Sequence, residues 1–162
     1  MIESLVERVI RNIIRAYRLF EEISGRDIPK DILKSVLDET EHIAIHELAH
    51  GVMYTIYPEI DIIKEENKSL CECIDEIAGR FLERYVSSKI GTHVHSFEEH
   101  LHELRSYTSL SRINISVEEL EELYKQFIKL IRRKELKRAV NVVIVKCREW
   151  IISRGIERSY HG

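Results

Sequence analysis

Few residues in this sequence can break a helix, and that scarcity limits the folds open to the chain. Its 162 residues include only two prolines and six glycines. Between them, apolar residues recur at intervals of three and four, which is the period of an amphipathic α-helix. The pattern predicts one compact helical domain over residues 1–162, all-α or mostly α. We expect about five helices and little or no β-sheet.

Local signals set the expected ends of these helices. Ser24-Gly25 ends the first helix, Pro29 opens the second and Pro58 stops it. A Ser or Asp followed three residues later by Glu predicts a capping box and a helix start. Such pairs begin at Asp38, Ser69, Ser96 and Ser116. A polar, acidic loop is expected over 58–68. The expected helices are 2–23, 29–57 with a kink or restart near 39, 70–89, 96–107 and 116–153.

Two short segments are ambiguous. Residues 140–145 are rich in β-branched side chains, which would suit a buried strand. The helical period on both sides and the lack of turn residues favour a helix there. Ile113 to Ser116 is a second candidate for a short extended piece.

Composition narrows the class of protein. No apolar run approaches the roughly 18 residues of a membrane span, and the N-terminus lacks the apolar core of a secretory signal. The sequence therefore predicts a soluble, cytoplasmic protein. Abundant Glu, Lys and Arg with a single Gln resemble hyperthermophile usage. The three cysteines, an odd number, are interpreted as small buried apolar residues and not as disulfides or zinc ligands.

Charge is unevenly distributed along the chain. The net charge is −3, but residues 125–162 carry 11 Lys and Arg against 3 Glu, a balance of +8. A basic tail can indicate nucleic-acid binding. Here the basic residues are interleaved with core-type residues and aromatics are sparse. We interpret them as a solvated helix face and regard nucleic acid as an unlikely partner.

The run His46-Glu47-Leu48-Ala49-His50 carries the strongest chemical signal. Residues four apart on a helix lie on one face, one turn apart. Two imidazoles placed in this way can bind one tetrahedral metal ion. Glu47 lies beside the pair, in a position suited to a general base. The run predicts a single divalent metal, most simply Zn²⁺, held by His46 and His50.

The stretch from Ile43 to Val52 resembles the active-site helix of the zincin metallopeptidases, because the positions around the histidines are uncharged and no proline interrupts them. The resemblance covers about residues 39–85. It implies a zinc-dependent hydrolase, most simply a metallopeptidase acting on peptides or proteins, in which Glu47 activates a zinc-bound water. Most zincins carry a β-sheet before this helix, whereas residues 1–38 look helical here.

The resemblance also implies a third ligand. The metzincin branch would place a histidine at position 56, where this chain has Ile56. The gluzincin branch takes a glutamate from a downstream helix, commonly with a small residue three positions later. Glu76 followed by Gly79 fits best, and Asp75 followed by Ala78 is similar. Glu72 ranks third because a capping box is expected to occupy it. Those that do not bind metal could orient a ligating histidine.

Further residues could serve the same site. His42 lies one turn before His46 and could support a ligand or line the pocket. The histidines after Gly91 could replace the glutamate ligand or stabilise an oxyanion, although surface positions are the simpler interpretation; they are His93, His95, His100 and His102. Tyr54 could also donate to an oxyanion, but core packing is favoured for it.

The sequence is compatible with two other functions. Glu47-x-x-His50 and Glu99-x-x-His102, with Glu76 and either Glu21 or Glu22, imitate the ligand set of a di-iron carboxylate four-helix bundle. That arrangement would leave His46 without a role. Alternatively, the chain is a binding or regulatory module that retains a zincin-like metal site and presents its basic C-terminal helices to a partner.

Overall fold

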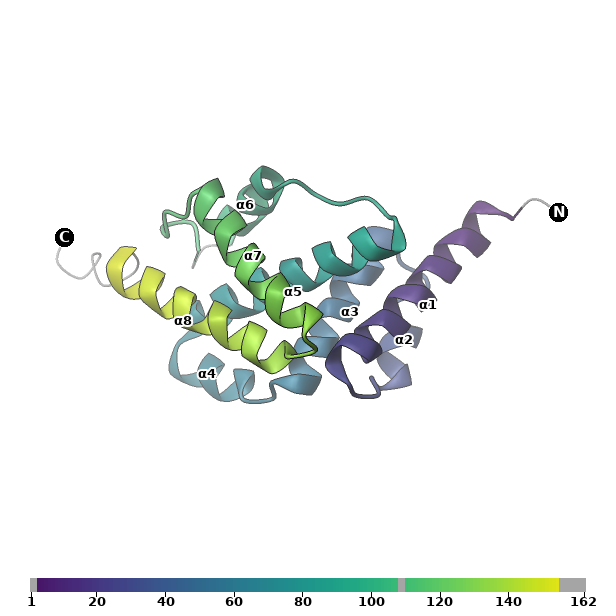
Figure 1. Ribbon diagram of the computed structural model, residues 1–162, viewed down its shortest axis with the longest axis horizontal. Helices are drawn as coiled ribbons and strands as arrows, with labels where there is room; N and C mark the ends of the chain where they lie inside the picture. The colour runs from purple at the N-terminus through teal and green to yellow at the C-terminus, as the bar shows by residue number, and fades with distance from the viewer. Residues whose placement is uncertain (1–2, 108–109, 155–162) are drawn as a thin grey trace.

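The computed structural model describes residues 3–107 and 110–154, and its regular structure there is entirely α-helical (Figure 1). The predicted fold class is confirmed, although these ranges contain eight helices and not five. The helices are α1 (Leu5–Ser24), α2 (Lys30–Val36), α3 (Glu41–Ile56), α4 (Ile60–Glu66), α5 (Lys68–Ile90), α6 (Phe97–Arg105), α7 (Val117–Arg132) and α8 (Leu136–Arg154).

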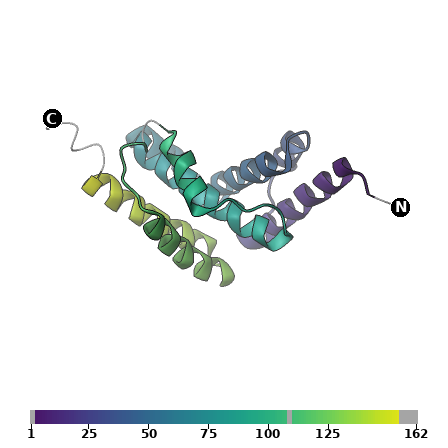
Figure 2. The same cartoon turned by 90° about the horizontal axis from the view of Figure 1, so that it is seen from above.

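Helix α5 lies at the centre of the molecule, between two helical layers. On one side it packs against α3, which also contacts α1 and α2, and on the other side it packs against α8, which pairs with α7. Seen from above, α1 and α3 lie on one side of α5, and α7 and α8 lie on the other (Figure 2). Because both faces of α5 are covered, most of its residues are buried.

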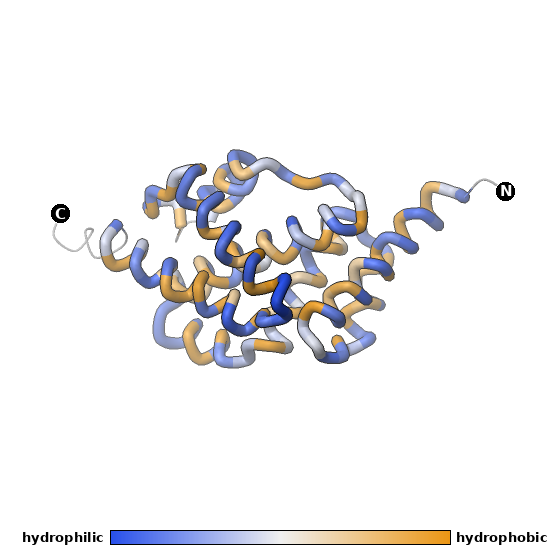
Figure 3. The backbone as a smooth tube through the Cα atoms, in the orientation of Figure 1, coloured by the Kyte–Doolittle hydropathy of each residue, from blue (hydrophilic) through white to orange (hydrophobic). Residues whose placement is uncertain are grey.

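The outer helices bury one face each. Figure 3 shows polar and apolar residues alternating in short blocks along α1 and α7, as the helical period predicts. Ile13, Ala16 and Phe20 of α1 are completely buried, and Phe127 of α7 is buried in the other layer. The apolar stripes predicted from the sequence therefore form the core over most of their length, although Leu5, at the start of the stripe in α1, is 66% exposed.

Several helix ends form as expected. Gly25 and Gly91 adopt left-handed conformations, with φ of 66° and 79°, and each donates its N–H back to the preceding turn. The capping boxes at Ser96 and Ser116 both form, each with the glutamate three residues on.

Two expected capping boxes do not form. The N-cap of α5 is Asn67, whose Oδ1 accepts from the N–H of Leu70 at 3.0 Å, so Ser69 already lies inside the helix. The N-cap of α3 is Thr40, and Glu41 accepts a hydrogen bond from the Asn12 side chain of α1 at 2.9 Å. A local cap two residues earlier replaces the predicted box at α5, and a tertiary contact with α1 occupies Glu41 at α3.

Two segment predictions also need correction. The expected loop 58–68 contains helix α4, anchored by the fully buried Ile60 and packed against α5. The last predicted helix is two helices, because the chain turns at Arg133–Glu135 with Lys134 at a φ of 59°. Residues 140–145 are helical within α8 as favoured, and 113–116 form no strand.

The ends of α7 and α8 are tied together by Glu119. Its two carboxylate oxygens accept from Trp150 at 3.2 Å and from Arg154 at 2.7 Å. The three cysteines are buried and free, which confirms their interpretation as core residues. None of the helices described here has the length and apolar character to cross a membrane.

Candidate metal centre

Two facing stripes of side chains line the contact between α3 and α5. His42, His46 and His50 follow one another at intervals of one turn on α3, with an axial rise of about 6 Å per step. The carboxylates of Asp75 and Glu83 on α5 contact the two ends of this stripe. His50 contacts the earlier part of α5 and His42 the later part, so the two helices run antiparallel.

The structure brings together the three residues that the sequence predicts as ligands. His46 Nε2 and His50 Nε2 lie 3.0 Å apart, and their rings are nearly perpendicular at 88°. Glu76 Oε1 lies 3.8 Å from His50 Nε2. One possible ligand atom from each residue falls within 4.8 Å of the other two. Two imidazole nitrogens and one carboxylate oxygen thus point at a common position.

Each of the two histidines is held by a carboxylate on its other nitrogen. His50 Nδ1 lies 2.9 Å from Asp75 Oδ1, and His46 Nδ1 lies 3.3 Å from Glu83 Oε2. A carboxylate accepts a hydrogen bond, so it favours the tautomer with the proton on Nδ1. In the neutral rings the Nε2 atoms then carry only lone pairs. Two lone pairs 3.0 Å apart repel unless a proton or a metal cation lies between them.

The charges around the pair favour such a cation. Burial lowers the pKa of His50, but the hydrogen bond to Asp75 and the negative charge of Asp75 outweigh it and leave the pKa raised. Burial raises the pKa of Glu83, but His46 and His42 outweigh it and leave the pKa lowered. Glu83 is therefore a buried carboxylate that stays ionised and adds negative charge to the centre.

Gly79 allows α5 to approach the histidines. A Cβ at this position would lie 3.1 Å from Cε1 of His50, closer than a methyl group normally sits. The small residue three positions after Glu76 therefore has the role that the sequence predicts. Any larger side chain here would push the imidazole away from its carboxylate.

Glu76 divides its two oxygens between two partners. Oε2 forms a buried ion pair with Nη1 of Arg80, while Oε1 faces the histidine pair. Burial lowers the pKa of Arg80, but the hydrogen bond and charge of Glu76 outweigh it and leave the pKa raised. Arg80 thus keeps its charge and holds the carboxylate in place, leaving one oxygen available.

Glu47 lies on the open side of the site. It is exposed and lines a groove of about 440 Å³ together with His50, Ile32 and Tyr54, between α2 and α3. In the described part of the chain, no group of possible ligands includes Glu47.

Tyr54 is 42% exposed, so the expectation that it packs in the core is wrong. Burial raises the pKa of Tyr54, and the charge of Asp75 adds to this.

The remaining predicted candidates lie elsewhere. None of the four later histidines joins His46 and His50, whether buried like His100 or exposed like His102. Asp75 contacts His50 at Nδ1, and not at the Nε2 that faces His46. Glu72 does not form the expected capping box with Ser69 and belongs to no group of possible ligands in the described ranges.

The ligand set of a di-iron bundle is not assembled. Glu99 is occupied by the capping box of α6, where its Oε1 accepts from the N–H of Ser96 at 3.0 Å. Glu21 accepts from the backbone N–H of Ile28, also at 3.0 Å. Among the residues described, neither is grouped with His50 or Glu76.

Two important residues were not singled out from the sequence, Glu83 and Arg80. Glu83 lies seven residues after Glu76, so it faces the same neighbouring helix two turns later. That spacing, together with the stripe of histidines on α3, could have indicated from the sequence that Glu83 lies near them.

Comparisons with known proteins add no name to this arrangement. No family model matches the sequence, and neither a curated protein nor a solved structure matches the chain. The function is therefore inferred from the chemistry of the chain's own residues.

Proposed function

We propose that this protein is a zinc-dependent hydrolase whose metal is held by His46, His50 and Glu76. The observation that carries the proposal is the pair of Nε2 atoms facing each other at 3.0 Å, each on a ring whose Nδ1 is fixed by a carboxylate. Such a pair is unfavourable unless a proton or a metal cation lies between the two nitrogens. Carboxylates behind metal-binding histidines are a regular feature of zinc sites.

The donor set suits a catalytic zinc. Two imidazole nitrogens and one carboxylate oxygen leave a fourth position open, whereas structural zinc sites use four protein ligands. The buried cysteines, which would favour a structural site, are absent from this group. When bound, zinc supplies a Lewis acid that lowers the pKa of its water and polarises a carbonyl.

The groove beside His50 supplies the other functions that hydrolysis needs. Glu47 is exposed on the groove, where its carboxylate can accept a proton from water and later deliver it to the leaving group. Tyr54 lines the same groove, and its raised pKa keeps the phenol protonated as a hydrogen-bond donor. Its hydroxyl can stabilise the negative charge that develops on a substrate carbonyl.

We infer that the substrate is a peptide or protein, in line with the resemblance of the α3 sequence to zincins, and that the protein acts in the cytoplasm. The groove is lined by Ile32 and Val36 as well as by polar groups. Because the described ranges contain no β-strand, a substrate would be held by side chains of α2 and α3, and not by an edge strand.

Metal binding is the first test. Zinc should be retained after dialysis and measured by elemental analysis, and His50→Ala should lose one equivalent because it deletes a ligand of this centre. His102→Ala is the matched control, since this exposed histidine belongs to no candidate group in the described ranges. Unchanged tight zinc in both His46→Ala and His50→Ala would refute the proposed centre.

Glu47→Gln tests the hydrolase itself. The variant should keep its zinc, because Glu47 is not a proposed ligand, while cleavage of a quenched fluorescent peptide library falls by about 10²–10⁴-fold. Loss of metal in Glu47→Gln would contradict the assigned role. A zinc-loaded wild-type protein that cleaves no peptide would refute peptidase activity while leaving the metal centre in place, as a binding or regulatory module would require.

A further inference from the structure

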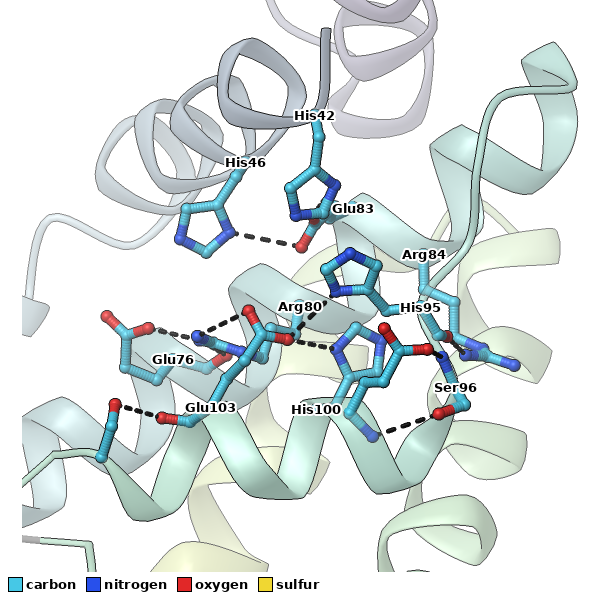
Figure 4. A network of polar contacts seen from close by, with 12 residues as sticks. His42, His46, Glu76, Arg80, Glu83, Arg84, His95, Ser96, His100 and Glu103 are labelled. Carbon is cyan, nitrogen blue, oxygen red and sulfur yellow. Dashed lines mark hydrogen bonds and ion pairs between the residues drawn. The ribbon is translucent and has the colours of Figure 1, made fainter. Parts of the chain in front are cut away.

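A second group of possible metal ligands lies on the far side of Glu83. His42 of α3, His95 before α6 and Glu103 of α6 each offer one ligand atom within 4.8 Å of the others. The rings of His42 and His95 stack with centroids 4.1 Å apart, and His95 Nδ1 lies 3.2 Å from Glu103 Oε1 (Figure 4). His42 is far from the other two in the sequence and meets them only in the folded chain.

A buried histidine that makes no hydrogen bond in the described part of the chain lies against this group. His100 is only 2% exposed, and neither of its ring nitrogens has a hydrogen-bond partner in the described part of the chain. Its Nδ1 lies 3.5 Å from Glu103 Oε1, and its ring centroid lies 5.9 Å from that of His95. Buried polar groups normally form hydrogen bonds, so an imidazole that forms none, beside three possible ligands, points to a missing cation.

We propose that His42, His95 and Glu103 form a second site for a divalent transition-metal ion, with the buried ring of His100 beside it. Imidazole nitrogens with one carboxylate suit Zn²⁺, Co²⁺ or Fe²⁺ and not Mg²⁺ or Ca²⁺, which prefer oxygen ligands. The stacked rings must turn for both to face one ion. His42 has room to do so, since its side chain is 37% exposed.

This site is distinct from the His46–His50–Glu76 centre but connected to it. The two oxygens of Glu83 face different centres, one 3.3 Å from His46 Nδ1 and the other 3.1 Å from His42 Nδ1. Arg80 pairs with Glu76 and also lies 3.7 Å from Glu103. The side chains of Glu83 and Arg80 therefore link the two centres. No ligand of the first centre is needed to form the second centre.

A third grouping competes for His95. His93, His95 and Glu99 also come within ligand distance of one another, but His93 and Glu99 are exposed. Glu99 Oε1 already accepts the backbone N–H of Ser96 in the capping box. Glu103, by contrast, has no helix-capping role and contacts two histidines. The site with His42 and Glu103 is therefore favoured, and experiment can separate the two.

The test is zinc stoichiometry by native mass spectrometry, with a chelator competition for affinities. The wild type should bind two equivalents, and Glu103→Gln or His42→Ala should lose one of them while keeping the other. On the same helix Glu99→Gln is the matched control, because glutamine also serves a capping box; it and His93→Ala should retain both equivalents. Circular dichroism checks that each variant stays helical.

Three results would overturn the proposal. They are a wild type that binds no more than one equivalent at saturating zinc, a Glu103→Gln variant that keeps both, and a second equivalent lost in Glu99→Gln but not in Glu103→Gln. His50→Ala separates this outcome from failure of the hydrolase proposal, because it should lose only the ion of the first centre. With Co²⁺ as the probe, the visible spectrum of His50→Ala should still show a bound ion, and further substitution of His42 should remove it.

Discussion

The two faces of α5 differ sharply in what they bury. Toward α7 and α8 the face is apolar, where the ring of Phe81 packs against Tyr124 and Phe127 at centroid distances of 5.1 and 5.3 Å. Toward α3 the face carries carboxylates and a guanidinium, and Glu76, Arg80 and Glu83 are all less than a tenth exposed. One helix thus forms an ordinary core on one side and a buried polar contact on the other.

This difference separates stability from function. Burying apolar rings stabilises a fold in proportion to the area removed from water. Burying charged groups costs free energy that their mutual attraction only partly offsets, so apolar replacements of similar size are often as stable or more so. The polar contact between α3 and α5 is therefore poorly explained by stability. The proposed role in holding metal would account for it.

The largest expected effect on stability lies on the apolar face. Phe127→Ala removes a fully buried ring and should lower the free energy of unfolding by about 3–5 kcal/mol. Zinc stoichiometry of the folded protein should not change, because Phe127 lies on the opposite side of α5 from His42, His46 and His50 of α3. Chemical denaturation and elemental analysis measure the two properties. Val145→Ala, at a position 63% exposed, is the control and should stay within about 0.5 kcal/mol.

The opposite behaviour is expected on the polar face. Replacing Glu76 and Arg80 together by Met should leave stability unchanged or raise it by about 1–4 kcal/mol, because a buried ion pair gives way to apolar packing. Tight zinc binding at the first centre should be lost with the Glu76 carboxylate. Denaturation in the presence of a chelator reports the stability without metal.

Single variants sharpen this comparison. Glu76→Met alone leaves Arg80 buried with Glu103 as its remaining acidic contact at 3.7 Å, so it should be less stable than the double variant. If the double variant proved much less stable than wild type, the polar face would be a stabilising feature and the contrast between the two faces would fail.

The sequence predicted the helices of this fold better than the breaks between them. Apolar periodicity and the glycine stops at Gly25 and Gly91 marked α1 and α5 to within a few residues. The turn between α7 and α8 carries no glycine or proline that would have marked it in the sequence. Lys134 adopts the left-handed conformation there instead. Helix α4 was not predicted, because its residues are mostly polar and its position depends on packing against α5.

The candidate site was predictable where one helix or two adjacent helices define it. The spacing of His46 and His50, and that of Glu76 and Gly79, are local, so the sequence could propose the three ligands that the structure groups together. The contact of His42 with His95 could not be read in the same way. It depends on the path of the chain between α5 and α6, which only tertiary packing sets.

The smallest and most specific effect is expected at Gly79, where stability and metal binding should move in opposite directions. Alanine favours a helix over glycine by about 1 kcal/mol, so Gly79→Ala should raise or maintain the stability of the metal-free protein. The new methyl group would lie 3.1 Å from Cε1 of His50 and would have to displace the ring that Asp75 orients. Loss of such orientation typically weakens metal binding by about 10–100-fold, and we expect the lower end of that range for the first centre.

Gly51→Ala provides the matched comparison, because it makes the same change in helix α3. The three atoms nearest to a Cβ at Gly51 would all belong to Ile32, with Cγ2 at 2.9 Å, so the strain falls on the contact between α2 and α3. Zinc affinity should then change less than in Gly79→Ala, even where stability falls more. Chelator competition measured on both variants decides the point. Equal losses of affinity would mean that Gly79 serves only helix packing, and that the position of the His50 ring does not limit how tightly the metal is held.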